Sequence, residues 1–216
     1  MIERTIAAST HGRYLIEPPA TPGPAPLLVG FHGYAEGAEA QLDRLRAIPG
    51  VDRWRIASVQ GLNRFYQRRT NDVIAGWMTR QDRELAIADN LAYVAAVIDE
   101  IGREWPAPPR VVLAGFSQGV AMTFRAAAAA PAVDGVIAVG GDVPPEIVPS
   151  ALARIPAALI CRGTRDEWYA AATFDNDVKR LREAGTGIEP LQYDGGHEWS
   201  GAVAQAAGRF LRERLA

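Results

Sequence analysis

The chain has one cysteine and no long apolar run, and each scarcity excludes a class of protein. Cys161 stands alone, so neither an intrachain disulfide nor a cysteine-based metal cluster can form. No apolar stretch approaches the ~18 residues of a membrane-spanning helix. Residues 1–10 also lack the basic segment and apolar core of a secretion signal. We therefore expect a cytoplasmic protein that does not span a membrane.

Neither sign of charge dominates the chain. Lysine and arginine number 23 against 25 aspartate and glutamate residues, which gives a formal net charge of −2. Without a basic field, the protein is not expected to bind nucleic acid or an anionic membrane surface. The length of 216 residues and the apolar content of 48% fit one domain, expected to span residues 1–216. Composition does not decide the oligomeric state, so a homodimer is neither predicted nor excluded.

The most informative stretch reads Gly-Phe-Ser-Gln-Gly at residues 115–119. It lies between an apolar, β-branched run at 111–114 and a stretch at 120–130 that is typical of a helix. A serine on so tight a turn is strained, and the residues two before and two after it must be small to avoid the neighbouring strand and helix. This setting predicts Ser117 as a nucleophile, although a Gly-Ser loop without chemistry is the alternative.

Strands alternate with helices along most of the chain, which predicts an α/β fold with a mostly parallel sheet, helices on both faces and no large cap domain. Residues 60–78 are expected to be an irregular, substrate-facing loop. The expected strands are 2–8, 13–17, 27–31, 54–59, 111–114, 136–139, 157–161 and 188–193. The expected helices are 42–48, 79–105, 120–130, 145–153, 171–184 and 200–215.

A serine nucleophile needs a base, and the chain has three histidines. In a parallel sheet the reactive groups lie beyond the carboxyl ends of the strands. His11 precedes the sheet and is expected to be solvated, and His32 is better placed to shape a turn. His197 follows the last strand, lies after two glycines and comes after the serine in chain order. We therefore expect His197 to be the base.

The base in turn needs an acid to orient it, and two aspartates follow suitable strands. Asp166 follows the penultimate strand and falls between Ser117 and His197, in the order nucleophile, acid, base. Asp142 follows the strand before it and is the rival. Asp166 is the preferred acid.

An oxyanion formed during acyl transfer needs two hydrogen-bond donors. The Gln118 N–H is one candidate because it begins the helix after the nucleophile. The other is the Tyr34 N–H, which follows the His-Gly pair after the strand at 27–31. Both donors belong to the backbone, so replacing the Gln118 side chain is expected to have little effect.

Taken together, Gly-Phe-His-Gly-Tyr at 30–34, Gly-Phe-Ser-Gln-Gly at 115–119, Gly-Thr-Arg-Asp at 163–166 and Gly-Gly-His-Glu at 195–198 resemble the α/β-hydrolase superfamily. Within it, the chain looks like the small phospholipase/carboxylesterase group that includes the acyl-protein thioesterases. The resemblance runs from about residue 26 to the end. It implies an α/β-hydrolase fold, a triad of Ser117, Asp166 and His197, and hydrolysis of carboxylic or thiol esters.

The chain departs from this group in two loops that could shape the substrate pocket. Glu-Trp-Tyr follows the acid where the family often has an apolar residue and a proline, and Gly-Trp-Met at 76–78 replaces an aromatic-acidic pair. Packing of the loop side chains on the core is the alternative, and the family's preference for acyl length should not be carried over. The residues expected to contact substrate are Phe65, Tyr66, Trp77, Met78 and Trp168.

The sequence therefore predicts a serine carboxylesterase or thioesterase that cleaves a small-molecule ester of small or medium acyl size through an acyl-enzyme on Ser117. A serine peptidase or amidase on the same fold is the alternative enzyme. A hydrolase-like protein that binds a ligand without turnover is the alternative outside catalysis. No metal or other cofactor is expected, because no cluster of His, Cys and carboxylate residues at ligand spacing exists.

Overall fold

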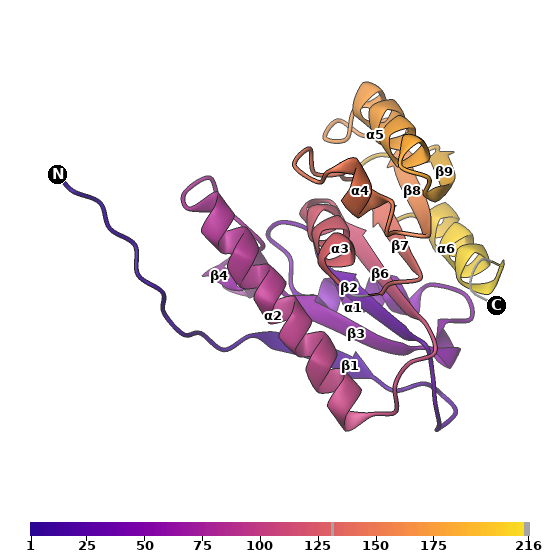
Figure 1. Ribbon diagram of the computed structural model, residues 1–216, viewed down its shortest axis with the longest axis horizontal. Coiled ribbons are helices and arrows are strands. Elements are labelled where there is room, and N and C mark those ends of the chain that lie inside the picture. Colours follow the sequence, from indigo (N-terminus) through magenta and orange to yellow (C-terminus); the bar gives the residue numbers. More distant parts are fainter. Residues whose placement is uncertain (131, 214–216) are drawn as a thin grey trace.

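A seven-stranded sheet forms the centre of the protein, in a computed structural model that describes residues 1–130 and 132–213 (Figure 1). The strand order is β1-β3-β2-β6-β7-β8-β9; β1 is antiparallel to β3 and all other neighbours are parallel. The strands are β1 (Arg13–Glu17), β2 (Leu27–Phe31), β3 (Arg55–Gln60), β6 (Val111–Phe116), β7 (Gly135–Val139), β8 (Ala157–Gly163) and β9 (Gly187–Tyr193). The predicted α/β fold with a mostly parallel sheet is confirmed.

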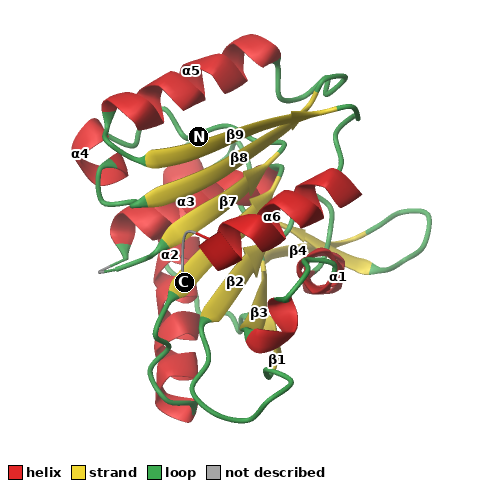
Figure 2. Cartoon of the chain, turned by 90° about the vertical axis from the view of Figure 1, so that its right-hand side faces the viewer, coloured by secondary structure: helices red, strands yellow, loops and turns green. Residues whose placement is uncertain are grey.

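Helices cover both faces of this sheet (Figure 2). Side chains of α2, α3, α4 and α5 pack on one face, and those of α1 and α6 pack on the other. A 3-10 turn, Val51–Arg53, precedes β3. The helices are α1 (Ala38–Arg46), α2 (Arg83–Glu104), α3 (Gln118–Ala129), α4 (Pro149–Leu152), α5 (Ala171–Glu183) and α6 (Gly201–Glu213). The end of the helix predicted at 200–215 lies outside the described residues.

The central strands are buried on both faces, which explains their unbroken apolar character. Along β2, Leu27 and Val29 join the core on the α3 side, while Leu28 joins the core on the α6 side. Burial of one such side chain stabilises the fold by about 1.5–3 kcal/mol. Phe124 of α3 and Phe210 of α6, both fully buried, close the two cores from opposite sides.

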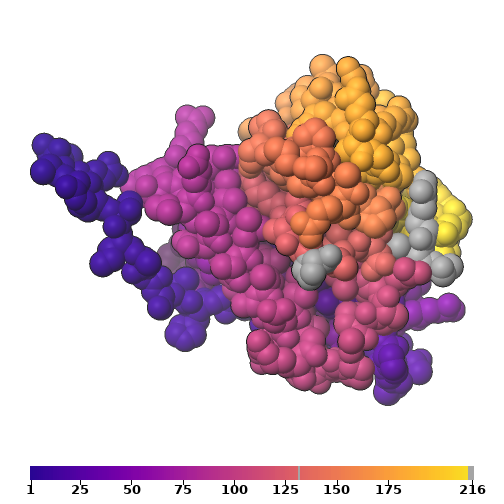
Figure 3. Space-filling view, viewed as in Figure 1, coloured from indigo at the N-terminus to yellow at the C-terminus, as the bar shows by residue number. Residues whose placement is uncertain are grey.

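The predicted strand at residues 2–8 is wrong. Residues 1–12 are exposed and form neither helix nor strand, and the segment extends away from the body of the molecule (Figure 3). Its largest apolar side chains, Ile2 and Ile6, are exposed at 76% and 93%. So little burial cannot offset the entropy lost when a strand is ordered. The neighbouring prediction at 13–17 matches β1.

The prediction of an irregular loop at 60–78 is also wrong, because this stretch contains an antiparallel hairpin. Its strands are β4 (Asn63–Tyr66) and β5 (Val73–Gly76). Both contain β-branched or aromatic residues, and Asn71 in the connecting turn takes the left-handed conformation that asparagine tolerates, with φ of 62°. These strand signals are present in the sequence beside an arginine-rich composition that is more typical of a loop.

Two helix predictions need correction at their starts. The helix predicted at 145–153 is only the short α4, because Val148 precedes a proline and is extended there, with φ of −71° and ψ of 154°. The helix α2 begins after Asp82, whose φ of 50° is left-handed and whose side chain makes no capping bond. Thr79, where the helix was expected to begin, lies before it and donates to the Gln81 carbonyl over 2.9 Å.

Candidate active site

Ser117 lies on the turn between β6 and α3, with φ of 52° and ψ of −120°. This conformation is strained for a residue with a side chain. A Cβ atom on Gly115 would lie 2.3 Å from the Thr123 hydroxyl, and one on Gly119 would lie 2.1 Å from the Phe31 carbonyl oxygen. Both contacts are shorter than atoms allow, so the turn accepts only glycine at these positions.

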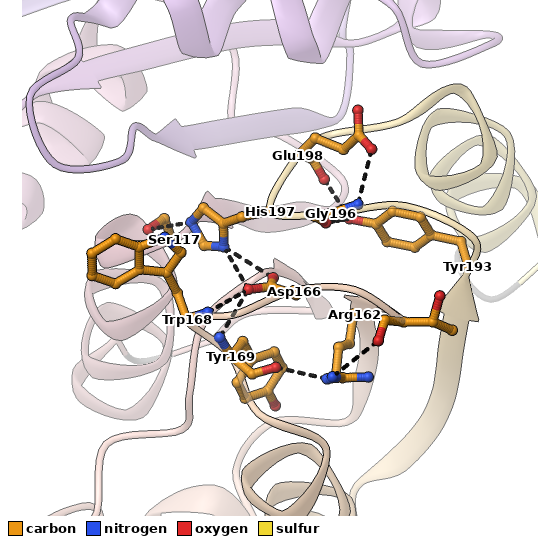
Figure 4. A network of polar contacts seen from close by, with 10 residues as sticks. Ser117, Arg162, Asp166, Trp168, Tyr169, Tyr193, Gly196, His197 and Glu198 are labelled. Atoms are coloured by element: carbon orange, nitrogen blue, oxygen red, sulfur yellow. Dashed lines mark hydrogen bonds and ion pairs between the residues drawn. The ribbon is translucent and has the colours of Figure 1, made fainter.

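His197 lies between Ser117 and Asp166 and makes hydrogen bonds to both (Figure 4). Its Nε2 is 2.9 Å from Ser117 Oγ, and its Nδ1 is 2.9 Å from Asp166 Oδ2. A carboxylate only accepts, so Nδ1 carries the proton and Nε2 is free to accept the serine proton. The serine, the histidine and the preferred aspartate are therefore brought together in one relay.

Asp166 is held in place by the backbone of its own loop. Its Oδ1 accepts from the N–H groups of Trp168 and Tyr169, each over 2.9 Å, and the residue is only 4% exposed. Tyr169 is fixed in turn by Arg162, which donates to its carbonyl, and by Asp177, which accepts from its hydroxyl. Figure 4 shows that Arg162 and Tyr169 lie on the side of the aspartate opposite His197. This second layer keeps the carboxylate aimed at the imidazole.

Asp177 is a buried carboxylate that the sequence analysis did not single out. Its Oδ2 accepts from the Val143 N–H and the Tyr169 hydroxyl, each over 3.0 Å, and so joins the loops after β7 and β8. Burial raises the pKa of Asp177, although these bonds and Arg180 oppose the rise. The rival acid, Asp142, lies in the first of these loops and makes no hydrogen bond to His197 in the described part of the chain.

His32 has a different environment from His197. It is fully buried, and its Nδ1 donates to the Gly33 carbonyl over 2.7 Å while its Nε2 accepts from the Gly61 N–H over 3.0 Å. Burial lowers the pKa of His32, with the Gly33 bond opposing the shift. The ring therefore stays neutral at neutral pH and holds the turn after β2.

The turn held by His32 contains Tyr34, the predicted oxyanion donor. In a trans peptide the N–H points away from the C=O, so fixing the Gly33 carbonyl on the His32 ring fixes the direction of the Tyr34 N–H. In the described residues, that N–H has no acceptor within the protein. The Gln118 N–H, at the first position of α3, has no intrahelical acceptor either. Both groups are free to donate to a ligand.

Two further contacts support this turn. The Glu36 carboxylate accepts from the Gly33 N–H over 2.8 Å and pairs with both terminal nitrogens of Arg44. Burial acts to raise the pKa of Glu36, but the Arg44 and Gly33 bonds outweigh it and hold the pKa below its usual range. On the other side, the Ala75 N–H of β5 donates to the Glu36 carbonyl over 2.8 Å. The β4-β5 hairpin thus supports the turn.

The Gln118 side chain has a role that was missed in the sequence. Its Oε1 accepts from the Trp77 N–H over 2.8 Å, and its Nε2 donates to the Met78 carbonyl over 3.3 Å. The side chain therefore fixes the segment between β5 and α2 beside the nucleophile. No local signal marks this, because the partners are about 40 residues apart. The side chain thus has a structural role beside that of the backbone N–H, and the small effect expected on replacing it stays a prediction.

The five residues predicted to contact substrate lie in different environments. Trp77 is fully buried and donates from Nε1 to the His32 carbonyl, so its placement as a pocket residue is wrong. Phe65 packs on the Tyr34 ring, with centroids 5.7 Å apart, and Tyr66 is 67% exposed on the hairpin. Met78 and Trp168 do line a hollow that contains Ser117.

Ser117 lines two hollows. The Arg125 hollow, of about 450 Å³, is lined by Met78, Arg83, Ser117, Arg125, Asp142 and Trp168 among others. The Arg44 hollow, of about 400 Å³, is lined by Tyr34, Glu36, Arg44, Ser117, His197 and Trp199 among others. An ester bound at Ser117 can extend in both directions. The base His197 lines the second of these hollows, and its ring also lies beside Gly140 and Trp168, which line the first.

Within residues 1–130 and 132–213, no three His, Cys, Asp or Glu side chains gather in a way that could hold a metal ion. Nor does any helix in these ranges combine the length and apolar character needed to cross a membrane. Cys161 is buried, and burial raises the pKa of its thiol.

The mostly parallel sheet, with a serine on a strained turn after a central strand and a histidine after the last strand, defines an α/β-hydrolase fold. A family model described as Phospholipase/Carboxylesterase matches residues 72–215. The chain therefore belongs to the phospholipase/carboxylesterase family. This confirms the resemblance proposed from the sequence. Comparison with curated protein sequences gives no match.

Solved structures share the fold at low sequence identity. Acyl-protein thioesterase 2 of Zea mays is 16% identical with a TM-score of 0.76, and the alignment covers 95% of this chain and 100% of that chain. A Mesorhizobium loti carboxylesterase is 19% identical with a TM-score of 0.75, and 94% of each chain is covered. A Bacillus cereus carboxylesterase is 16% identical with a TM-score of 0.74 and the same coverage. At these identities the likeness concerns the fold.

Proposed function

We propose that the protein is a serine hydrolase that cleaves small or medium acyl esters or thioesters through an acyl-enzyme on Ser117. The observation that carries the proposal is the continuous relay from Ser117 Oγ through His197 to Asp166, with both hydrogen bonds at 2.9 Å. Membership of the phospholipase/carboxylesterase family supports the same reaction class.

In the first half-reaction, Ser117 Oγ forms a bond to the acyl carbon while His197 Nε2 takes the hydroxyl proton. The carbonyl becomes an oxyanion. The intermediate then collapses, the bond to the leaving alcohol or thiol breaks, and His197 gives that group its proton. Asp166 holds the imidazole in the reactive tautomer and stabilises the imidazolium that forms.

In the second half-reaction, His197 takes a proton from water as the water oxygen attacks the acyl-enzyme carbonyl. The Ser117 oxygen leaves, recovers the proton from His197, and the carboxylic acid is released. We assign the Tyr34 and Gln118 N–H groups to the oxyanion in both halves, because they flank Ser117 and lack acceptors of their own. Each such donor contributes a factor of about 10² to 10³ in rate.

The test compares an oxygen ester, a thioester and an amide that share one acyl group. We expect the purified protein to hydrolyse the ester and the thioester, with a burst of the first product equal to the concentration of active sites, and to turn over the amide far more slowly. The Ser117→Ala variant should show neither burst nor turnover. Preferred turnover of the amide would point to a peptidase or amidase, and binding without turnover of any of the three would contradict the proposal.

A further inference from the structure

Arg125 is a buried cation in the hollow that contains Ser117. It lies on α3, eight residues or just over two helical turns after the serine, which corresponds to about 12 Å along the helix axis. Its side chain is only 4% exposed. Side chains in a helix tilt toward the N-terminus, so the guanidinium is directed back toward the Ser117 end of the hollow.

One edge of this guanidinium has no oxygen partner. Glu146 Oε1 accepts from Nε over 2.9 Å and from Nη2 over 2.6 Å. In the described residues, the only partner of Nη1 is Met78 Sδ at 3.7 Å, and a thioether is a weak acceptor. Met78 lines the hollow with Arg125, whereas Glu146 does not. The edge with unmet donors is therefore the one that faces the hollow.

The charge at this end of the hollow is positive. Arg83 also lines the hollow, and its nearest carboxylate oxygen is the same Glu146 Oε1, 3.5 Å away. Two guanidinium groups therefore share one carboxylate at this end, while Asp142, which also lines the hollow, balances the remaining positive charge over the hollow as a whole. Asp142 is on the loop whose glycine packs against the start of α3.

The position of His197 indicates which part of an ester enters this hollow. The leaving group must take its proton from His197, and His197 lines the Arg44 hollow. We accordingly assign the leaving alcohol or thiol to the Arg44 hollow. The acyl group is left in the Arg125 hollow.

We propose that the Arg125 hollow is an acyl subsite that recognises a carboxylate at the far end of the acyl chain. Arg125 Nη1 donates to this carboxylate and Arg83 contributes its charge, so the preferred substrates are monoesters or monothioesters of short dicarboxylic acids. This inference deepens the proposed function and rests on it. A buried guanidinium with an unfilled edge selects such a group because a methyl end leaves its donors unpaired.

The test uses two acyl groups of equal length, the 4-nitrophenyl monoester of adipic acid and 4-nitrophenyl hexanoate. The measured quantity is the ratio of their kcat/KM values within each protein, so that a general loss of activity cancels. We expect the wild-type ratio to favour the adipate monoester and the Arg125→Gln variant to lower it about 10- to 100-fold, the range for a charge-assisted hydrogen bond. Arg125→Lys should retain part of the preference.

Two further variants test whether a changed ratio reflects a folding defect at the buried Arg125. Arg83→Gln removes a half-exposed charge and should lower the ratio of kcat/KM values about threefold, which lies within the range for a charge interaction screened by solvent. The matched control is Arg103→Gln, an exposed arginine near the other end of α2 that pairs only with Glu100 in the described residues. Its ratio should equal that of the wild type. Equal ratios in the wild type, Arg125→Gln and Arg83→Gln proteins would overturn the subsite.

A binding measurement separates this proposal from the proposed function. The Ser117→Ala protein is titrated calorimetrically with monomethyl adipate and with methyl hexanoate. Tighter binding of the adipate ester that is lost on adding Arg125→Gln supports the subsite even if no ester is hydrolysed. Hydrolysis by the wild type without any preference for the carboxylate would overturn the subsite and leave the proposed function intact. A preference seen only when the carboxylate is on the alcohol side would overturn the acyl assignment.

Discussion

The loops around His32 and His197 offer a direct comparison, because each histidine follows a parallel strand at the same edge of the sheet. Both nitrogens of His32 are bonded to backbone groups of Gly33 and Gly61, and the ring is fully buried. Only one nitrogen of His197 is held, by Asp166, and the other faces the Ser117 hydroxyl in a hollow open to ligands.

The difference shows that residue type and position at the sheet edge do not decide the role of a histidine. The role depends on whether the second nitrogen reaches a group that changes during a reaction. His32 has its proton fixed by partners that cannot titrate, so it can only position the turn that presents the Tyr34 N–H. His197 can accept and return a proton. The predictions below test this division.

The largest effect is expected at the relay itself. His197→Ala leaves Ser117 without a base, and kcat/KM for an ester should fall by about 10⁴ to 10⁶. Ser117→Ala should give a similar loss, and the double variant should lose little more, because the two groups act as a unit. Steady-state kinetics of the three proteins on one ester check this. Losses that multiply in the double variant would argue against a shared step.

The next effect is expected at the acid. Asp166→Asn removes the charge that fixes the Nδ1 proton, and kcat should fall by about 10⁴. Asp142→Asn serves as the matched control because Asp142 follows the neighbouring strand and makes no bond to the imidazole in the described residues. It should lose far less activity. The reverse order in the kinetics would move the acid to the loop after β7.

A smaller loss is expected for His32→Gln. The glutamine cannot hold the Gly33 carbonyl and accept from Gly61 in the same geometry, so the Tyr34 N–H is less well aimed at the oxyanion. We expect kcat to fall about 10- to 100-fold while KM changes little. This loss is smaller than or equal to the smallest loss seen when an oxyanion donor is removed altogether, about 10²-fold. A drop as large as that of His197→Ala would end the distinction between the two histidines.

Gln118→Met keeps the backbone N–H and the side-chain volume but removes both side-chain bonds. The Trp77 N–H and the Met78 carbonyl lose their partner, which should lower the free energy of unfolding by about 1–3 kcal/mol. Activity should fall less than tenfold. Urea unfolding followed by tryptophan fluorescence measures the first quantity and ester kinetics the second. Unchanged stability would mean that the Gln118 side-chain bonds do not stabilise the fold and that only its backbone N–H has a role.

The smallest effect concerns pH. Burial lowers the pKa of His32 below its unfolded value, which is about 6.5, so the unfolded chain binds more protons in this window. The stability that the neutral ring contributes is fully present above this value and is lost as the pH falls from it through the lower pKa of the folded state. Urea midpoints at pH 7.5 and 5.5 should therefore differ more for the wild type than for His32→Gln. An equal pH dependence in both proteins would contradict a buried, neutral His32.

The sequence predicted most strands of the sheet and the residues that meet at its edge, because these depend on local patterns and on chain order. Apolar runs identify buried strands, and the carboxyl ends of parallel strands fall on one edge. Supporting residues were not predictable in this way. Arg125 pairs with Glu146 21 positions away, and Gln118 with Trp77 41 positions away, so periodicity within one element cannot detect either pair.

The environment of Trp77 was likewise not predictable from local sequence. A tryptophan in an irregular-looking stretch was expected in the pocket, yet its ring packs against Phe31 and its N–H meets the His32 carbonyl. The hairpin that precedes it turns this part of the chain into the core. Pairing between strands in this stretch decided the environment of Trp77, and that pairing was not predicted.

Ester hydrolysis by this protein requires Ser117 to be a nucleophile that His197 activates. Reaction with a fluorophosphonate probe, followed by peptide mapping, tests this directly. We predict one adduct, on Ser117, that forms quickly in the wild type and at least a hundredfold more slowly in His197→Ala. A probe that leaves Ser117 unmodified, or that labels it equally fast without the imidazole, would contradict the account.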